Sequence, residues 1–167
     1  MKILVTGGAG FVGARLSREI LRQGSLAGRP VTELAIADQF APPADLAADP
    51  RVRVHTAPLL TQGELFASGF DGVFHLASAV SGECELDFEL GLRSNLDSTR
   101  ALLDALRARV EGGAAPTRLV FSSSVAVFGP DDAHPMPDVV TDDTLPTPQT
   151  SYGIQKYICE QLVADYT

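Results

Sequence analysis

Apolar residues along the chain follow two patterns, one typical of strands and one typical of helices. Short apolar or alternating runs, which predict buried strands, occupy residues 2–6, 31–37, 51–55, 72–76 and 117–121. Other stretches have apolar residues three or four positions apart, and the longest of them, residues 88–110, predicts a helix. Strands that alternate with helices form a parallel sheet covered on both faces. We therefore predict an α/β fold, a Rossmann-type doubly wound parallel sheet, with residues 1–167 as one domain.

Glycines follow the first predicted strand directly. Gly7, Gly10 and Gly13 lie three residues apart, and residues 8–13 also fit the spacing G-x-G-x-x-G. The stretch after them predicts an amphipathic helix with Phe11 on its apolar face. A strand, a glycine loop and a helix in this order form the dinucleotide-binding fingerprint, because bare backbone lets a pyrophosphate approach the start of the helix. The alternative is a glycine-rich turn that binds no ligand.

An acidic residue ends the second predicted strand. Asp38 lies 25 positions after Gly13. A carboxylate at this place accepts hydrogen bonds from the adenosine ribose hydroxyls and repels a 2′-phosphate. Asp38 therefore predicts NAD rather than NADP, and the alternative is a solvated loop carboxylate.

Small and polar residues follow the fourth and fifth predicted strands. Ala77 and Ser78 come after the fourth strand, and Ser122, Ser123 and Ser124 come after the fifth. Ligands in open α/β sheets bind at the carboxyl ends of the strands. A ligand-binding edge and ordinary strand ends, capped by their own hydroxyls, are both open at this point.

Tyr152 and Lys156 are the strongest candidates for chemistry. In a helix, residues four apart lie on one face, one turn from each other. A nearby ammonium favours the phenolate form, which a proton acceptor needs. Ser151 is predicted to cap this helix at its start. Asn95 lies inside the longest helical stretch, where it has either a role in the site or, more simply, an exposed side chain.

Composition and charge exclude several classes of function. The hydrophobic fraction of 45% and the charged fraction of 20% are typical of a soluble globular protein. A net charge of −8 argues against binding to nucleic acid or to an anionic membrane. No apolar run has the length of a membrane span or the pattern of a signal peptide, which predicts a cytoplasmic protein. Cys84 and Cys159 predict reduced thiols, and the scattered histidines predict no metal site.

Two further features concern the last third of the chain. Residues 129–150 are rich in proline and acidic side chains and predict a long loop, a type of segment that is often functional. The chain stops one helix after the fifth strand, where a six-stranded nucleotide-binding fold has a further strand. We expect residues 1–167 to be truncated before the substrate-binding part and to have weak or no turnover alone.

These motifs together resemble the extended short-chain dehydrogenase/reductase family, the NAD-dependent epimerases and dehydratases. The matching segments, in the family's order, are residues 6–13 (T-G-x-x-G-x-x-G), 75–78 (H-L-A-A), 95–99 (N-x-x-G-T), 121–129 (the serine strand) and 152–156 (Y-x-x-x-K). Within the family, residues 81–82 with 87–93, residues 123–129 and residues 141–153 are most similar to the branch that oxidises D-erythronate, a four-carbon sugar acid, at C2 with NAD.

The resemblance implies a role for each site residue. Tyr152 would take the proton from the substrate hydroxyl, and Lys156 would hold the nicotinamide ribose hydroxyls and support Tyr152. Ser124 would hydrogen-bond the reacting oxygen, with Ser123 as the fallback, and Asn95 would position Lys156 through water or backbone. The residues implied to line NAD are Gly7, Gly10, Phe11, Val12, Gly13, Asp38, Leu59, Leu76, Ala77, Ser78, Tyr152 and Lys156.

The chain departs from the family pattern at three places. Residues 57–59 read Ala-Pro-Leu instead of Gly-Asp-Leu, so an adenine contact is lost or supplied otherwise. Ser98 replaces the glycine of N-x-x-G-T, and Gln155 replaces the serine that commonly precedes the lysine.

The implied activity is oxidation of a secondary hydroxyl in a small sugar acid, and it has two competitors. A nucleoside-diphosphate-sugar 4-epimerase would use the same residues and NAD. A non-catalytic NAD-binding protein, or an inactive fragment, is the other. A 4,6-dehydratase is disfavoured because Val125 and Ala126 stand where that chemistry needs an acidic pair. A homodimer through the helices that contain Asn95 and Tyr152 is open.

Overall fold

The computed structural model describes residues 1–167, which form two compact units. The sheet unit comprises Met1–Ser78 and Ala101–Ser122, and the helical unit comprises Ala79–Arg100 and Ser123–Thr167. The chain passes into the helical unit after Ser78, returns within a helix after Arg100, and leaves again after Ser122. Whether the two units act as one domain stays a prediction.

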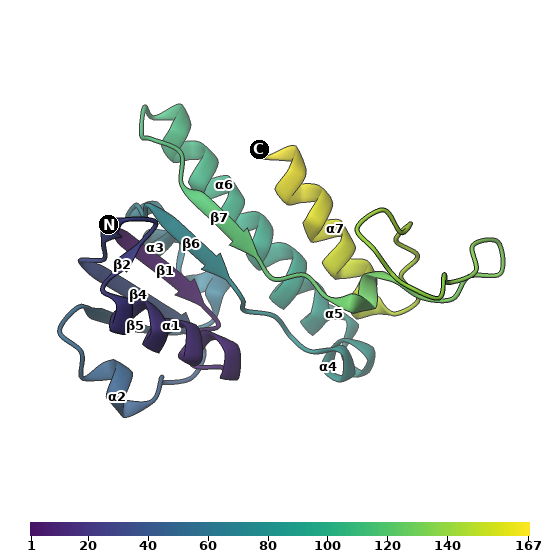
Figure 1. Ribbon diagram of the computed structural model, residues 1–167, viewed down its shortest axis with the longest axis horizontal. Coiled ribbons are helices and arrows are strands. Elements are labelled where there is room, and N and C mark those ends of the chain that lie inside the picture. Colours follow the sequence, from purple (N-terminus) through teal and green to yellow (C-terminus); the bar gives the residue numbers. More distant parts are fainter. The chain divides into compact units, whose positions relative to one another are not determined.

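A five-stranded parallel sheet forms the centre of the sheet unit (Figure 1). Its strands, in spatial order, are β5 (Val52–Thr56), β4 (Glu33–Asp38), β1 (Lys2–Thr6), β6 (Gly72–His75) and β7 (Arg118–Phe121). All five predicted strands are confirmed, with ends shifted by one or two residues. The order reverses at β1, which is the switch point where open α/β sheets bind ligands.

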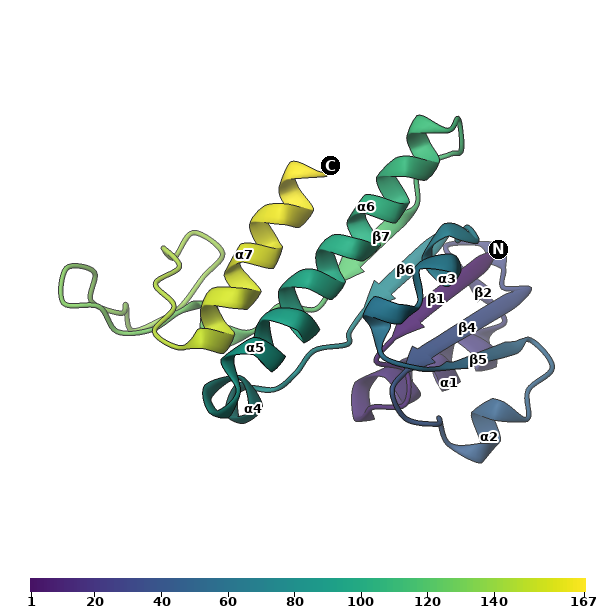
Figure 2. The same cartoon turned by 180° about the vertical axis from the view of Figure 1, so that it is seen from behind.

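Helices cover both faces of this sheet because residues of β1 point alternately to either side. Ile3 and Val5 pack with Ile20 of α1 (Phe11–Gln23), on the face that α2 (Ala44–Ala47) also covers. Leu4 packs on the other face with Phe66 of α3 (Gly63–Ala67) and with Leu102 of α6 (Ser98–Glu111). Figure 2 shows α3 on the side opposite to α1. The doubly wound α/β prediction is thus confirmed.

The register of the sheet brings the carboxyl ends of its strands to one edge. Thr6 of β1 pairs with Ala37 and with His75, and Asp38 pairs with Thr56. The glycine loop, the chain after Asp38 and the chain after His75 therefore leave the sheet at the same edge.

Two short features escaped the sequence patterns. A hairpin of β2 (Ser25–Leu26) and β3 (Arg29–Pro30) follows α1, with positive φ at Ala27 and Gly28 in its turn. Helix α2 is one turn long and lies within residues 41–50, a stretch rich in proline, alanine and aspartate. Neither feature is long enough to show the hydrophobic periodicity of a strand or a helix.

The helical unit contains no strand and is built around α7 (Ser151–Asp165). α4 (Ser81–Leu86), α5 (Phe88–Gly91) and a π-helical segment (Leu92–Asp97) pack against α7, as does the 3-10 turn Val125–Val127. Residues 129–150 contain no helix or strand, which confirms the predicted loop. None of the protein's helices is both long and apolar enough to cross a membrane.

The longest predicted helix is interrupted. Residues 88–110 fall into α5, the π-helical segment and α6 rather than one continuous α-helix. A π turn contains an extra residue, so it shifts the face that the following residues present. Asn95 lies in this segment and is only 2% exposed, so of its two alternatives the exposed side chain is wrong.

Candidate active site

The glycine loop of the sheet unit has no space for side chains at two of its glycines. Gly7 has φ +69°, and a Cβ there would lie 2.7 Å from the backbone nitrogen of Ala77. A Cβ on Gly13 would lie 2.2 Å from the carbonyl oxygen of Gly7. The loop is closed by the N–H of Gly10, which donates to the same carbonyl at 3.1 Å. Glycine is therefore required here for a tight turn and for close packing of α1 on β1.

The chain after β6 is fixed beside this loop by one hydroxyl. Thr6 Oγ1 accepts from the backbone N–H groups of Leu76 at 3.2 Å and Ala77 at 3.3 Å. It also lies 2.7 Å from Nδ1 of the buried His75. Together with the close approach of Gly7 to Ala77, these bonds place Leu76 and Ala77 next to the glycine loop.

Asp38 is tied to the same loop. Its Oδ2 accepts from the backbone N–H of Ala9 at 3.0 Å, and its Oδ1 accepts from that of Phe40 at 3.1 Å. Each carboxylate oxygen keeps a second lone pair for a ligand hydroxyl. Leu59 lies in a 3-10 turn after β5 and packs, partly buried, against the hydrophobic cluster that contains Leu4 and Phe66. Gly7, Ala77 and Asp38 are therefore brought together, with Leu59 on the neighbouring strand end.

The exposure of Phe11 and Val12 differs from what the amphipathic pattern of α1 predicted. Phe11 is 89% exposed and Val12 is 61% exposed, so placing Phe11 on the buried face of α1 was wrong. Both follow Gly10 in the first turn of α1, and no side chain caps that turn. Two apolar side chains and uncapped N–H groups thus lie together at the start of the helix.

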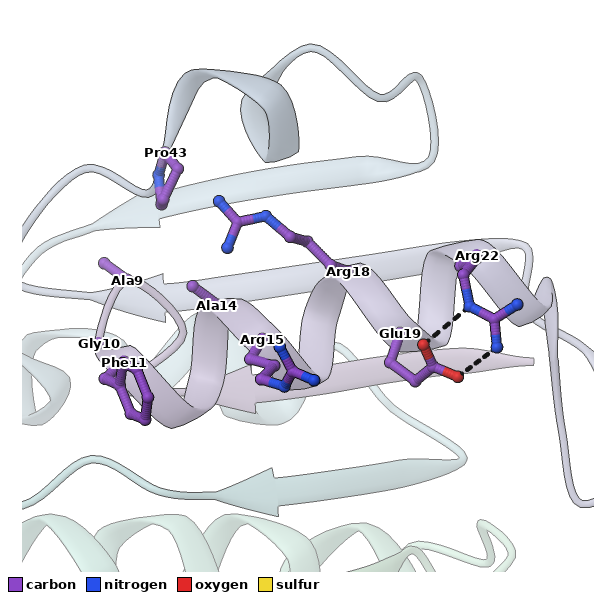
Figure 3. A pocket seen from close by; sticks show the side chains of 9 residues that line it. All are labelled: Ala9, Gly10, Phe11, Ala14, Arg15, Arg18, Glu19, Arg22 and Pro43. Carbon is purple, nitrogen blue, oxygen red and sulfur yellow. Dashed lines mark hydrogen bonds and ion pairs between the residues drawn. The ribbon is translucent and has the colours of Figure 1, made fainter.

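A cleft of about 540 Å³ borders the loop along α1 (Figure 3). Residues 9–11 line one end of it, and Figure 3 shows three arginines of α1 along its length. Arg18 binds both carboxylate oxygens of Asp45, at 2.6 and 2.9 Å, and Arg22 pairs with Glu19 at 2.6 Å. Two of the three arginine charges along the cleft are therefore matched by carboxylates of the chain itself.

In the helical unit, α7 presents the predicted proton-transfer pair. Tyr152 is half-buried in its first turn, and Lys156 one turn later is only 3% exposed. Lys156 Nζ lies 5.9 Å from the centroid of the Tyr152 ring. Burial lowers the pKa of Lys156 because desolvation disfavours the ammonium, and the negative charge of Glu160 acts in the opposite direction.

The last two of the three serines after β7 have different partners. Ser124 Oγ accepts from the N–H of Ala126 at 3.2 Å and so caps the 3-10 turn, which leaves its O–H free to donate. The hydroxyl of Ser123 donates to Glu160 on α7. Of these two serines, only Ser123 donates its hydroxyl to a carboxylate.

Gly153 allows α7 to contact the serine segment. A Cβ on Gly153 would lie 2.1 Å from the carbonyl oxygen of Ala126. The side chain of Thr150 caps the helix by accepting from the Gly153 N–H at 3.0 Å. The predicted cap at Ser151 is thus one residue too late, because Ser151 already belongs to the helix.

Asn95 and Gln155 form a buried amide network. Asn95 Oδ1 accepts from the N–H of Ala79 at 2.8 Å, and Asn95 Nδ2 donates to Gln155 Oε1 at 2.8 Å. Gln155 Nε2 then donates to Ser151 Oγ at 3.0 Å. Gln155 is 2% exposed, so its substitution for serine in the motif gives a specific contact between Asn95 and α7. The sequence patterns indicated no role for Gln155, Gly153 or Glu160.

Comparison with known proteins shows the family to which the chain belongs. Residues 3–167 match the NAD dependent epimerase/dehydratase family. The chain is 46% identical to a D-erythronate dehydrogenase of Cupriavidus necator and 37% identical to one of Haemophilus influenzae, aligned in each case over 100% of its length. A UDP-glucose 4-epimerase of Corynebacterium glutamicum is 31% identical over 99% of the chain. The chain spans about half the length of these relatives, namely 51%, 50% and 46%.

Solved structures agree with this placement. A nucleoside-diphosphate-sugar epimerase from Agrobacterium tumefaciens superposes with a TM-score of 0.87 at 44% identity, over 99% of this chain and 48% of that one. A UDP-glucuronic acid 4-epimerase from Bacillus cereus, in complex with UDP-glucuronic acid and NAD, gives a TM-score of 0.80 at 26% identity over 99% and 52%.

Proposed function

Because the chain belongs to the NAD-dependent epimerase/dehydratase family, we propose that it carries the NAD-binding and proton-transfer residues of a sugar-acid dehydrogenase. The reaction is oxidation of a secondary hydroxyl, as in D-erythronate, by hydride transfer to NAD. The pair of Tyr152 and the buried Lys156, 5.9 Å from ring centroid to Nζ, is the observation that carries the proposal. The identity of 46% to a D-erythronate dehydrogenase supports the substrate class.

The sheet unit fits a dinucleotide. Side chains at Gly7 and Gly13 would fill the turn, and the uncapped start of α1 offers N–H groups and the positive end of the helix dipole to a pyrophosphate. Asp38 is placed to accept from ribose hydroxyls. NAD, when bound, supplies the hydride acceptor, and the protein supplies orientation and proton transfer.

Residues of the helical unit perform the proton transfer. The Tyr152 phenolate takes the proton of the substrate hydroxyl while a hydride leaves the carbon that bears this hydroxyl, which yields a carbonyl. The ammonium of Lys156 stabilises the phenolate before transfer. Ser124 donates its O–H to the reacting oxygen, and Asn95 holds the start of α7 through Gln155.

We also propose that α7 contributes to a homodimer. Ile154 and Ile158 lie one turn apart on it and are 46% and 38% exposed. Burial of such an apolar stripe against a second copy would remove it from water. Sedimentation of the full-length protein measures its oligomeric state directly.

The test is an assay of the full-length gene product with a panel of four-carbon sugar acids. NAD and NADP are supplied in parallel, and the absorbance of the reduced cofactor is followed. NAD reduction with D-erythronate supports the proposal, and no reduction with any acid opposes it.

The second candidate is a nucleoside-diphosphate-sugar 4-epimerase, favoured by the 31% identity to a UDP-glucose 4-epimerase. An epimerase returns the hydride to its sugar, so no reduced cofactor accumulates in solution. Interconversion of UDP-glucose and UDP-galactose without net NAD reduction therefore identifies this alternative.

Asp38→Asn is expected to lower the preference for NAD over NADP by at least about 10-fold, because it removes the charge that repels a 2′-phosphate. Calorimetric titration with both cofactors measures the ratio. Asp45→Asn is the matched control, since this carboxylate follows seven residues later in the chain and pairs with Arg18 at the surface. An unchanged ratio in the Asp38 variant would show that another group selects the cofactor.

Gly13→Ala is expected to weaken NAD binding by about 100-fold, or about 2.7 kcal/mol. Its Cβ cannot lie 2.2 Å from the Gly7 carbonyl oxygen, so the loop must open. Titration of NAD into the variant is compared with Gly63→Ala, where a Cβ meets nothing within 4 Å. Normal affinity in the Gly13 variant would contradict a role of this turn in binding.

A further inference from the structure

One face of α7 carries a third functional group besides the proton-transfer pair. Tyr152, Lys156 and Glu160 are spaced by four residues, so they lie one above the other along the helix. The hydroxyl of Ser123 donates to Glu160 Oε1. Ser123 directly precedes Ser124, the proposed donor to the substrate oxygen. Glu160 thus contacts the serine segment and stands one turn from the lysine.

Glu160 differs in charge from the two thiols that also lie around Lys156. The titratable groups that act on Lys156 include Cys159 and Glu160 of α7 and Cys84 of α4, with the Tyr152 phenol one turn before it. Burial raises the pKa of both thiols, so both are neutral at neutral pH. Of the two thiols and the carboxylate, only Glu160 then bears negative charge.

We propose that Glu160 is a positioning residue with two effects on the proton-transfer site. Its carboxylate anchors the serine segment to α7 through Ser123, and its charge keeps the buried Lys156 in the ammonium form. The effect on the charge of Lys156 is a property of the folded chain. The anchoring of the serine segment rests on the function proposed above. Neither effect requires Glu160 to touch substrate or cofactor.

Two substitutions separate these effects. Glu160→Gln keeps an oxygen that accepts from Ser123 and removes the charge. Ser123→Ala removes the hydrogen bond and leaves the charge of Glu160 in place. If Glu160 acted only by filling space, neither substitution would change the titration of Lys156.

Lys156 can be titrated without any assay of turnover. The full-length protein is labelled with ¹³C-ε-lysine, and Lys156→Arg assigns the NMR signal of Lys156. Within residues 1–167 the only other lysine is the exposed Lys2. The midpoint of Lys156 is expected to fall by about one pH unit in Glu160→Gln, because loss of a nearby opposite charge disfavours the ammonium. It is expected to stay unchanged in Ser123→Ala and in Asp165→Asn, a neutralised carboxylate further along α7. Coincident midpoints in Glu160→Gln and the unsubstituted protein would overturn the electrostatic effect.

Turnover of the full-length protein then tests the anchoring effect. Ser123→Ala is expected to lower kcat about 10-fold with little change in KM, since Ser124 is misplaced rather than removed. In Glu160→Gln, kcat is expected to decline at a lower alkaline pH, by the same interval as the NMR midpoint. An unchanged kcat in Ser123→Ala would overturn the anchoring effect. If the unsubstituted protein does not oxidise sugar acids, the proposed function fails, while the NMR titration still decides the electrostatic effect.

Discussion

Tyr152→Phe is expected to reduce sugar-acid-dependent NAD reduction by about 100- to 10,000-fold, the range for loss of a positioned acid–base group. The ring and its packing beside Lys156 remain, and only the phenolic oxygen that accepts the substrate proton is lost. Initial rates of NADH formation, together with an NAD titration, measure the effect. The affinity for NAD is expected to change little.

Tyr157→Phe is the matched control for this variant. Tyr157 lies on the same helix, is also half-buried, and follows Lys156 directly. Its variant is expected to keep nearly full activity. Comparable rates in the Tyr152 variant and the unsubstituted protein would show that another group takes the proton.

Gly153→Ala is expected to damage both the stability and the chemistry of the helical unit. A Cβ 2.1 Å from the Ala126 carbonyl oxygen must push α7 away from the 3-10 turn that Ser124 caps. Overpacking of this kind costs about 1–3 kcal/mol, and Tm falls by about 2–4 °C for each kcal/mol in a chain of this size. Misplacement of Tyr152 relative to Ser124 by about 1 Å would lower kcat by about 100-fold.

Gly82→Ala provides the control for this substitution. Gly82 also lies in a helix of the helical unit, α4, but a Cβ there meets nothing within 4 Å. It is expected to leave kcat unchanged and to be neutral or slightly stabilising, since alanine favours a helix more than glycine does. If both variants have the same Tm and kcat as the unsubstituted protein, the contact between Gly153 and Ala126 does not control the site.

The sheet could be predicted because its strands are short apolar runs that end at glycine, aspartate or serine. The pattern failed where tertiary contacts decided the structure. Phe11 has the spacing of a buried helix residue, yet it lies in the first turn beside the glycine loop and is 89% exposed. Asn95 has the polarity of a surface residue, yet the π-helical segment turns it inward to the backbone of Ala79.

Only part of the candidate site could be predicted from local sequence. Tyr152 and Lys156 have a fixed spacing on one helix, and Gly13 has a fixed position after a strand, so local sequence indicates them. Gln155 and Glu160 act through partners 60 and 37 residues away, which no local pattern encodes. Glu160 continues the four-residue spacing of Tyr152 and Lys156, but this spacing does not indicate its partner Ser123.

The central claim, net hydride transfer from a sugar acid to NAD, is tested most directly with D-erythronate that carries deuterium at C2. The full-length protein is incubated with this substrate and NAD, and the free cofactor is analysed by mass spectrometry. We predict that deuterated NADH accumulates in proportion to the acid consumed. Absence of NADH, with UDP-glucose converted to UDP-galactose by the same preparation, would contradict the dehydrogenase and assign the residues to an epimerase.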